Sequence, residues 1–161
     1  RFGWAKPVPI NPYNFRNIKW GYFWTSIAGV LTNLITAFLI YPVYVLFTRY
    51  IVFDFLLFDE LFIIFLWFVY AISLNLVVFN LIPVYPLDGY RVLEVATKGR
   101  GKVMEFLRKY GYYVLLGLLL LHFVVNRFPQ IPEYFDIFGM FMNLVTGWLS
   151  FPITAFWELF L

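Results

Sequence analysis

Two long runs without a charged residue dominate the first half of the chain. The first covers residues 20–47 and the second covers residues 61–82. A helix needs about 20 apolar residues to cross the hydrocarbon core of a bilayer, so each run is long enough for a transmembrane helix. Pro42 lies inside the first run, where we expect it either to kink the helix or to mark its exit.

Two further apolar segments follow in the second half. A short one covers residues 110–125 and has the sole histidine, His122, near its end. A polar linker at 126–136 separates it from the last segment, residues 137–156. That segment either spans the membrane or lies at its surface, and its length favours a span. The choice stays open because the segment holds several polar or helix-bending residues: Asn143, Thr146, Gly147, Ser150 and Pro152.

The remaining stretches differ in character. Residues 1–19 are rich in proline, which lacks an N–H and favours extended neighbours, so we expect an extended segment there. Residues 91–109 carry six Lys and Arg residues and are expected to form a basic loop. The pattern therefore predicts an all-α membrane protein with about four transmembrane or membrane-embedded helices and an extended, proline-rich N-terminal segment.

Composition and charge support a membrane location. Hydrophobic residues make up 63% of the 161 residues and charged ones 13%, against about half and a quarter in soluble domains. The net charge of +3 resides in the gaps between apolar runs, without the basic–aromatic groove that nucleic-acid binding needs, so the lipid bilayer is the predicted partner. Lys and Arg alternate with acidic gaps, which places the N-terminal segment and the 83–109 loop in the cytoplasm and the protein in the cell membrane. Without cysteine, disulfides and thiolate chemistry are excluded.

Candidate chemistry is concentrated where the second apolar run ends, in the stretch NLIPVYPLDG at 80–89. Pro83 and Pro86 must break the helix, and Asn80 can bond to the backbone groups thus freed. Asp88 is then a carboxylate held at membrane depth, and Gly89 permits a turn or a close approach of the backbone. Such a carboxylate suits zinc, which accepts Asp oxygen beside His nitrogen. An interfacial turn in which Asp-Gly caps a helix is the alternative interpretation.

Three ordered motifs resemble one family. The stretch 80–89 resembles the N-x-x-P-x-P-x-x-D-G signature of site-2 protease-like intramembrane zinc metalloproteases. GWAKPVPINP at 3–12 looks like a segment of the bacterial and archaeal branch, and AGVLTN at 28–33 resembles its A-G-P-x-x-N element, with Val30 where Pro is usual. The resemblance covers about residues 1–97, whereas residues 98–161 match only in being hydrophobic.

The resemblance implies that Asp88 is the third zinc ligand. The other two ligands would be histidines of an H-E-x-x-H helix whose Glu is the general base, and that helix would precede Arg1. Since the chain does not begin with Met, we expect it to start partway through a longer protein. His122 has Leu118 four residues before it rather than His or Glu, so it is interpreted as a polar residue near a span end.

The other motif residues have a mechanical interpretation, to which plain helix packing is the alternative. Gly29 and Asn33 are one helical turn apart, where Gly permits close helix contact, and Asn33 and Asn80 are the predicted substrate-binding residues. The chain is thus interpreted as part of an intramembrane zinc endopeptidase that cleaves membrane-spanning protein substrates. With one zinc ligand of three, these 161 residues alone are expected to be inactive.

Two further points complete the sequence-based interpretation. The alternative function is a non-catalytic membrane adaptor that binds transmembrane segments. Residues 1–97 form a partial protease core, and residues 98–161 hold the basic loop and two hydrophobic segments. The sequence does not indicate an oligomeric state.

Overall fold

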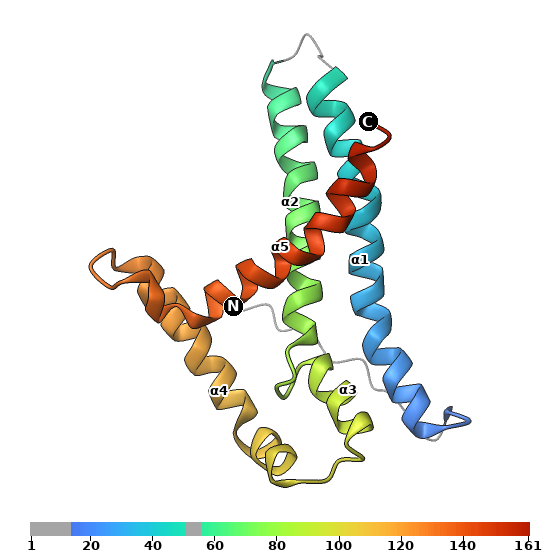
Figure 1. Ribbon diagram of the computed structural model, residues 1–161, viewed down its shortest axis with the longest axis vertical. Coiled ribbons are helices and arrows are strands. Elements are labelled where there is room, and N and C mark those ends of the chain that lie inside the picture. Colours follow the sequence, from blue (N-terminus) through green and yellow to red (C-terminus); the bar gives the residue numbers. More distant parts are fainter. Residues whose placement is uncertain (1–13, 51–55) are drawn as a thin grey trace.

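The computed structural model describes residues 14–50 and 56–161. The described chain is helical, with one short 3-10 helix among the α-helices (Figure 1). In chain order the elements are α1 (Ile18–Tyr50), α2 (Leu56–Leu81), α3 (Asp88–Ala96), α4 (Lys102–Arg127), η2 (Glu133–Phe135) and α5 (Ile137–Glu158).

Helices α1 and α2 form the centre of the molecule as an antiparallel pair (Figure 1). Their shared core contains Ala37 of α1 and Tyr70 and Leu74 of α2, which are almost fully buried. Ile153 of α5 completes this cluster. The small side chain of Ala37 allows the helix backbones to approach closely, which favours helix packing in a membrane.

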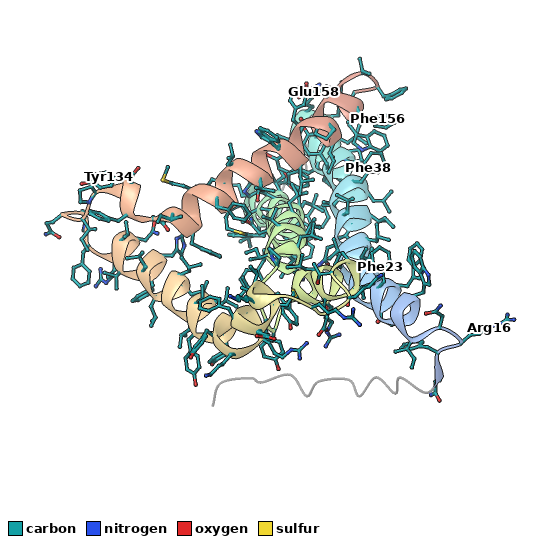
Figure 2. All side chains as sticks on the ribbon, turned by 60° about the horizontal axis from the view of Figure 1, so that its bottom comes forward. Arg16, Phe23, Phe38, Tyr134, Phe156 and Glu158 are labelled. Carbon is teal, nitrogen blue, oxygen red and sulfur yellow. The ribbon has the colours of Figure 1, made fainter. Side chains whose placement is uncertain are left out.

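Helix α5 crosses the α1–α2 pair obliquely and is held by its C-terminal half (Figure 1). The indole N–H of Trp157 donates to the backbone carbonyl of Phe38 at 2.9 Å. The ring of Phe38 also lies 5.3 Å from the ring of Phe156, and Figure 2 shows the two side by side where the helices meet. One hydrogen bond and an aromatic cluster therefore fix α5 to α1.

Most large apolar side chains of the long helices face outward rather than inward. Phe65 of α2 is 58% exposed, and Trp148 and Phe151 of α5 are more than 70% exposed. Within the described ranges, four helices are long and apolar enough to cross a membrane: α1, α2, α4 and α5. Such surfaces are stable only in lipid, and the chain is an integral membrane protein with the predicted all-α fold.

The structure confirms the four apolar segments and corrects their edges. Helix α1 continues past Pro42 to Tyr50, so of the two alternatives for Pro42 the helix exit is excluded. The predicted extended segment 1–19 is shortened, because α1 begins at Ile18, and its residues 1–13 lie outside the described ranges.

The predicted basic loop at 91–109 is also wrong. It contains most of α3 and the start of α4, which begins at Lys102, eight residues before the predicted third span. Charged residues are good helix formers when the opposite face is packed, and here Tyr90 and Met104 provide buried anchors. A short turn at residues 97–101 joins the two helices.

Helices α4 and α5 form a hairpin closed by a polar cluster. Nδ1 of His122 lies 2.8 and 2.9 Å from the two carboxylate oxygens of Asp136, and Asn126 donates to the same carboxylate at 3.2 Å. Asp136 caps α5 by accepting from the backbone N–H of Gly139 at 2.8 Å. His122 is thus a hairpin residue with an acidic partner 14 positions later.

The same contacts set the protonation of Asp136, which is 13% exposed. Burial alone would raise its pKa. The Gly139 N–H, His122 and Asn126 together outweigh burial, so the pKa of Asp136 lies below its ordinary value of 3.8. The ionised carboxylate therefore stabilises the hairpin.

Replacing Asp136 with Ala removes the helix cap and the partner of His122. We expect the free energy of unfolding in detergent to fall by about 0.5–2 kcal/mol. Because the folded-state pKa is lowered, this stabilisation is complete above pH 3.8 and is lost as the pH falls through the lowered value. The difference in the free energy of unfolding between wild type and variant should therefore become smaller below pH 3.8. The matched control is Glu133→Ala at an exposed carboxylate of η2, and an equal loss there would contradict the assignment.

Candidate metal-ligand loop

Asp88 is the first residue of α3 and follows a tight loop at residues 82–87. Helix α2 ends at Leu81 because Pro83 and Pro86 have no N–H to continue its ladder. The loop then closes on itself, since Val84 N donates to Ile82 O and Leu87 N donates to Val84 O, both at 2.8 Å. The predicted helix break is confirmed, and it presents Asp88 directly after the break.

Gly89 lets α3 start in contact with the end of α2. A Cβ at this position would overlap the carbonyl oxygen of Leu81 and would lie 2.6 Å from the carbonyl oxygen of Ile82. Those neighbours are backbone atoms and cannot rotate away. Only glycine therefore allows this approach, and the close approach expected at Gly89 is confirmed.

Helix α4 supports the loop from its other side. A Cβ at Gly111 would lie 3.0–3.2 Å from the backbone N and O of Tyr85, so a side chain there would push the loop slightly away and glycine favours the close contact. The guanidinium of Arg108 donates to the Tyr90 hydroxyl at 3.2 Å and to Glu94 at 2.7 Å. Tyr90 is buried and its ring packs edge-on against Tyr85. Sequence reasoning missed this support, because it joins residues far apart in the chain.

The Asp88 carboxylate has a mixed environment. Its side chain is 34% exposed, and Nη1 of Arg91, one turn later, lies 4.0 Å from Oδ1. Burial raises the pKa of Asp88, and the positive charge of Arg91 opposes this only in part, so the pKa lies above its usual value. The carboxylate is therefore partly accessible and is not engaged in a close ion pair.

Asp88 fits zinc as one ligand rather than as a complete site. Carboxylate oxygen is an accepted zinc donor, and a catalytic zinc takes three protein ligands and a water. Within residues 14–50 and 56–161, no three His, Cys, Asp or Glu side chains gather closely enough to hold a metal. These residues alone therefore do not make a zinc site.

The other predicted site residues lie on the two central helices. Asn80 is half-buried in the last turn of α2, and Asn33 is half-buried in α1. Gly29 is exposed, and a Cβ there would meet nothing within 4 Å among the described residues. The helix contact expected at Gly29 is therefore not made in this part of the chain, because the face of α1 that packs inward runs through Val30 and Ala37.

These features define a polytopic membrane protein with an acidic side chain fixed at a helix break. A family model described as peptidase family M50 matches residues 57–122. Among curated proteins, "Putative zinc metalloprotease YwhC" of Bacillus subtilis (strain 168) is 39% identical over 124 residues, covering 73% of this chain. The chain belongs to peptidase family M50, which confirms the resemblance to site-2 protease-like metalloproteases.

The extent of these matches adds two facts. The aligned region covers 54% of the Bacillus protein, so the chain spans about half the length of the curated relative that it matches. The family match runs from α2 through the Asp88 loop and on to His122, beyond the residue-97 limit of the motif resemblance. The search of solved structures gave no match.

Replacing Gly89 with Ala should destabilise the protein and displace α3. The added methyl group meets the backbone of Leu81 and Ile82, and overpacking of this kind costs about 1–3 kcal/mol. Thermal unfolding in detergent measures the loss. Gly117→Ala in α4 is the control, since nothing lies within 4 Å of its Cβ and Ala favours a helix. Wild-type stability of Gly89→Ala would show that the contact is not tight.

Proposed function

We propose that this chain is part of an intramembrane zinc endopeptidase in which Asp88 is the third zinc ligand. The observation that carries the proposal is the position of Asp88, directly after the proline-broken end of α2 and fixed there by the contact at Gly89. Membership of peptidase family M50 and the name of the Bacillus relative support zinc-dependent proteolysis. The proposed substrates are membrane-spanning proteins, because the carboxylate lies at the end of membrane-crossing helices.

The chain's own residues would bind and orient the reacting groups. Zinc, when bound, polarises a carbonyl and lowers the pKa of its water. Asp88 would hold the metal on the side where its carboxylate is accessible, and the loop between α2 and α3 would keep that oxygen in place. Asn80 and Asn33 would donate from their amides to substrate carbonyls, since neither makes a side-chain hydrogen bond within the described residues.

The metal assignment is tested in the full-length protein with Asp88→Asn. We expect cleavage of a membrane-spanning substrate to fall by more than about 100-fold, since loss of a residue that only hydrogen-bonds to a metal ligand already costs about 10–100-fold. The zinc content of the purified protein should fall with it. Glu105→Gln, an exposed carboxylate near the start of α4, is the matched control and should keep both. Full zinc content and activity in Asp88→Asn would refute the assignment.

The same two readouts separate metal binding from substrate positioning. Asn80→Ala should lower kcat/KM by about 10-fold, the value of one hydrogen bond, while its zinc content is unchanged. Asn75→Ala is the control on the same helix, because its amide already donates to the Ala71 carbonyl at 2.9 Å. Equal effects of both variants would assign Asn80 to packing rather than to substrate.

We propose that the end of the molecule that carries α3 faces the cytoplasm. Arg91, Lys98, Arg100, Lys102, Arg108 and Lys109 all lie there, whereas η2 and the N-terminus of α5 carry Glu133 and Asp136. The positive-inside rule then sets the orientation.

The chain has no cysteine, so single cysteines can report its orientation. In intact cells, a membrane-impermeant thiol reagent should label Tyr134→Cys in η2 but not Thr97→Cys after α3. After cell lysis both should react. The opposite labelling pattern would reverse the orientation.

A further inference from the structure

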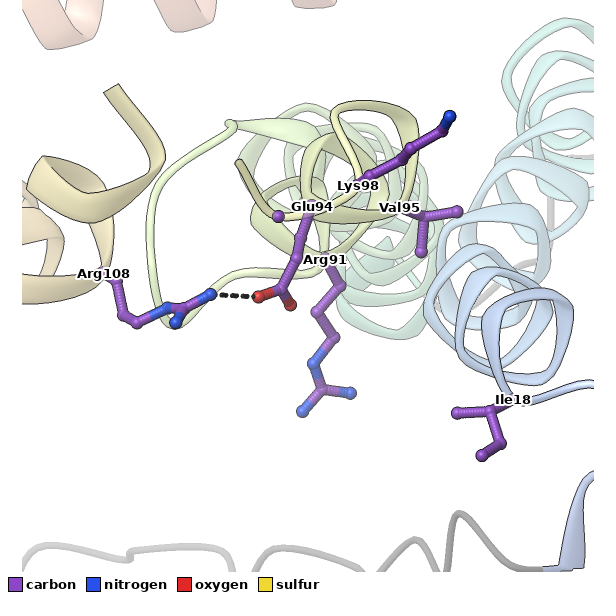
Figure 3. A pocket seen from close by; sticks show the side chains of 7 residues that line it. Ile18, Arg91, Glu94, Val95, Lys98 and Arg108 are labelled. Carbon is purple, nitrogen blue, oxygen red and sulfur yellow. Dashed lines mark hydrogen bonds and ion pairs between the residues drawn. The ribbon is translucent and has the colours of Figure 1, made fainter. Parts of the chain in front are cut away.

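A cavity of about 530 Å³ opens between the start of α1, the outer face of α3 and the start of α4. Figure 3 shows the side chains that surround it. They combine a charged wall with a small apolar edge: Arg91, Lys98, Arg108 and Glu94 form the wall, and Ile18 and Val95 form the edge.

The cavity carries an excess of positive charge. Three cations and one carboxylate line it, and the carboxylate of Glu94 is already bound to Arg108 at 2.7 Å. Arg91 reaches only the distant 4.0 Å contact with Asp88. Lys98 makes no ion pair within the part of the chain that the structure describes. Arg91 is thus available to an anion, and Lys98 joins it by rotation of its flexible side chain, whose ammonium points away from Arg91 in Figure 3.

Lys98 stands just after the C-cap of α3, at a position that usually carries glycine. Its φ of 56° lies in the left-handed region, where a residue with a Cβ costs about 1–2 kcal/mol. The turn after α3 is closed by the Gly99 N–H donating to Glu94 O at 2.8 Å. Glycine or asparagine would fit this turn without strain. Strained backbone of this kind gathers at ligand-binding sites.

The cavity lies beside the first turn of a membrane helix. Ile18 is the first residue of α1, which is long and apolar enough to cross a membrane. Trp20 and Trp24 beside it are each 58% exposed, as expected of an aromatic belt at the membrane surface. An anion at this depth, above an apolar edge, has the form of a phospholipid: a phosphate for the guanidinium and ammonium groups, with its acyl chains against α1.

We propose that this cavity binds the headgroup phosphate of an anionic phospholipid. In this proposal Arg91 and Lys98 contact the phosphate. The ion pair with Glu94 keeps Arg108 beside it. Ile18 and Val95 contact the glycerol and the first methylenes of the acyl chains. The site needs no metal. Its test on protein treated with a chelator is therefore independent of the zinc-protease proposal.

The experiment titrates phosphatidylglycerol into the full-length, chelator-treated protein in detergent and measures bound lipid by native mass spectrometry. Phosphatidylcholine is the neutral comparison. Each cation near a membrane surface contributes enough to change affinity by about fivefold, so Arg91→Gln/Lys98→Gln should bind phosphatidylglycerol about 30-fold more weakly. Lys102→Gln/Lys109→Gln removes the same charge from the same end of the molecule but outside the cavity, and should change affinity less than about threefold.

A single variant distinguishes loss of lipid binding from a folding defect. Lys98→Gly removes the charge and the left-handed strain together, so it should raise the thermal stability while lowering the phosphatidylglycerol affinity about fivefold. Opposite changes in stability and affinity cannot come from misfolding.

Three results would overturn the proposal. Equal losses in the two double variants would indicate diffuse surface attraction, and equal binding of phosphatidylcholine would remove the role of charge. Displacement of phosphatidylglycerol by millimolar inorganic phosphate would identify a site for the free anion rather than for a lipid.

Discussion

The backbone contact between Gly89 and the carbonyls of Leu81 and Ile82 determines how the two halves of this molecule meet. It brings the start of α3 against the end of α2, and so it fixes where Asp88 can lie. It also directs α3 along the end of the α1–α2 pair, which places Tyr90 under the Arg108 side chain of α4. The loop, the short helix and the base of α4 are therefore organised around one position without a side chain.

The membrane explains why such contacts matter more than apolar area. Lipid tails are as apolar as Leu or Phe, so burying those side chains between helices gains little. What distinguishes one helix arrangement from another is close packing at small residues and a few polar contacts. Close packing occurs at Ala37, Gly89 and Gly111. The polar contacts are the hydrogen bonds of Trp157 and Asp136.

The sequence predicted those features that depend on local composition. Two uncharged runs of sufficient length and two further apolar segments indicated the four membrane helices, and Pro83 and Pro86 indicated the break before Asp88. Sequence reasoning failed where contacts between residues far apart in the chain determine the local structure. The charges at 91–109 suggested a loop, because the packing of Tyr90 and Met104 was invisible, and the partner of His122 lies 14 residues away across a turn. At Gly29, no described residue lies within 4 Å of a Cβ, and the packed face of α1 runs through Val30 and Ala37.

The distribution of contacts along the chain has a consequence for how the protein assembles. The α1–α2 pair joins neighbours in sequence, and so does the α4–α5 hairpin with its polar closure. Two hydrogen bonds join α1 to the C-terminal end of the chain: Trp157 to Phe38 and Tyr50 to Leu161, which are 119 and 111 residues apart. Local pairings close small loops and form early, whereas distant ones wait for the ends to meet. During synthesis, the α1–α2 pair can therefore form before α5 is made, and the final step is the docking of the last turns of α5 onto α1.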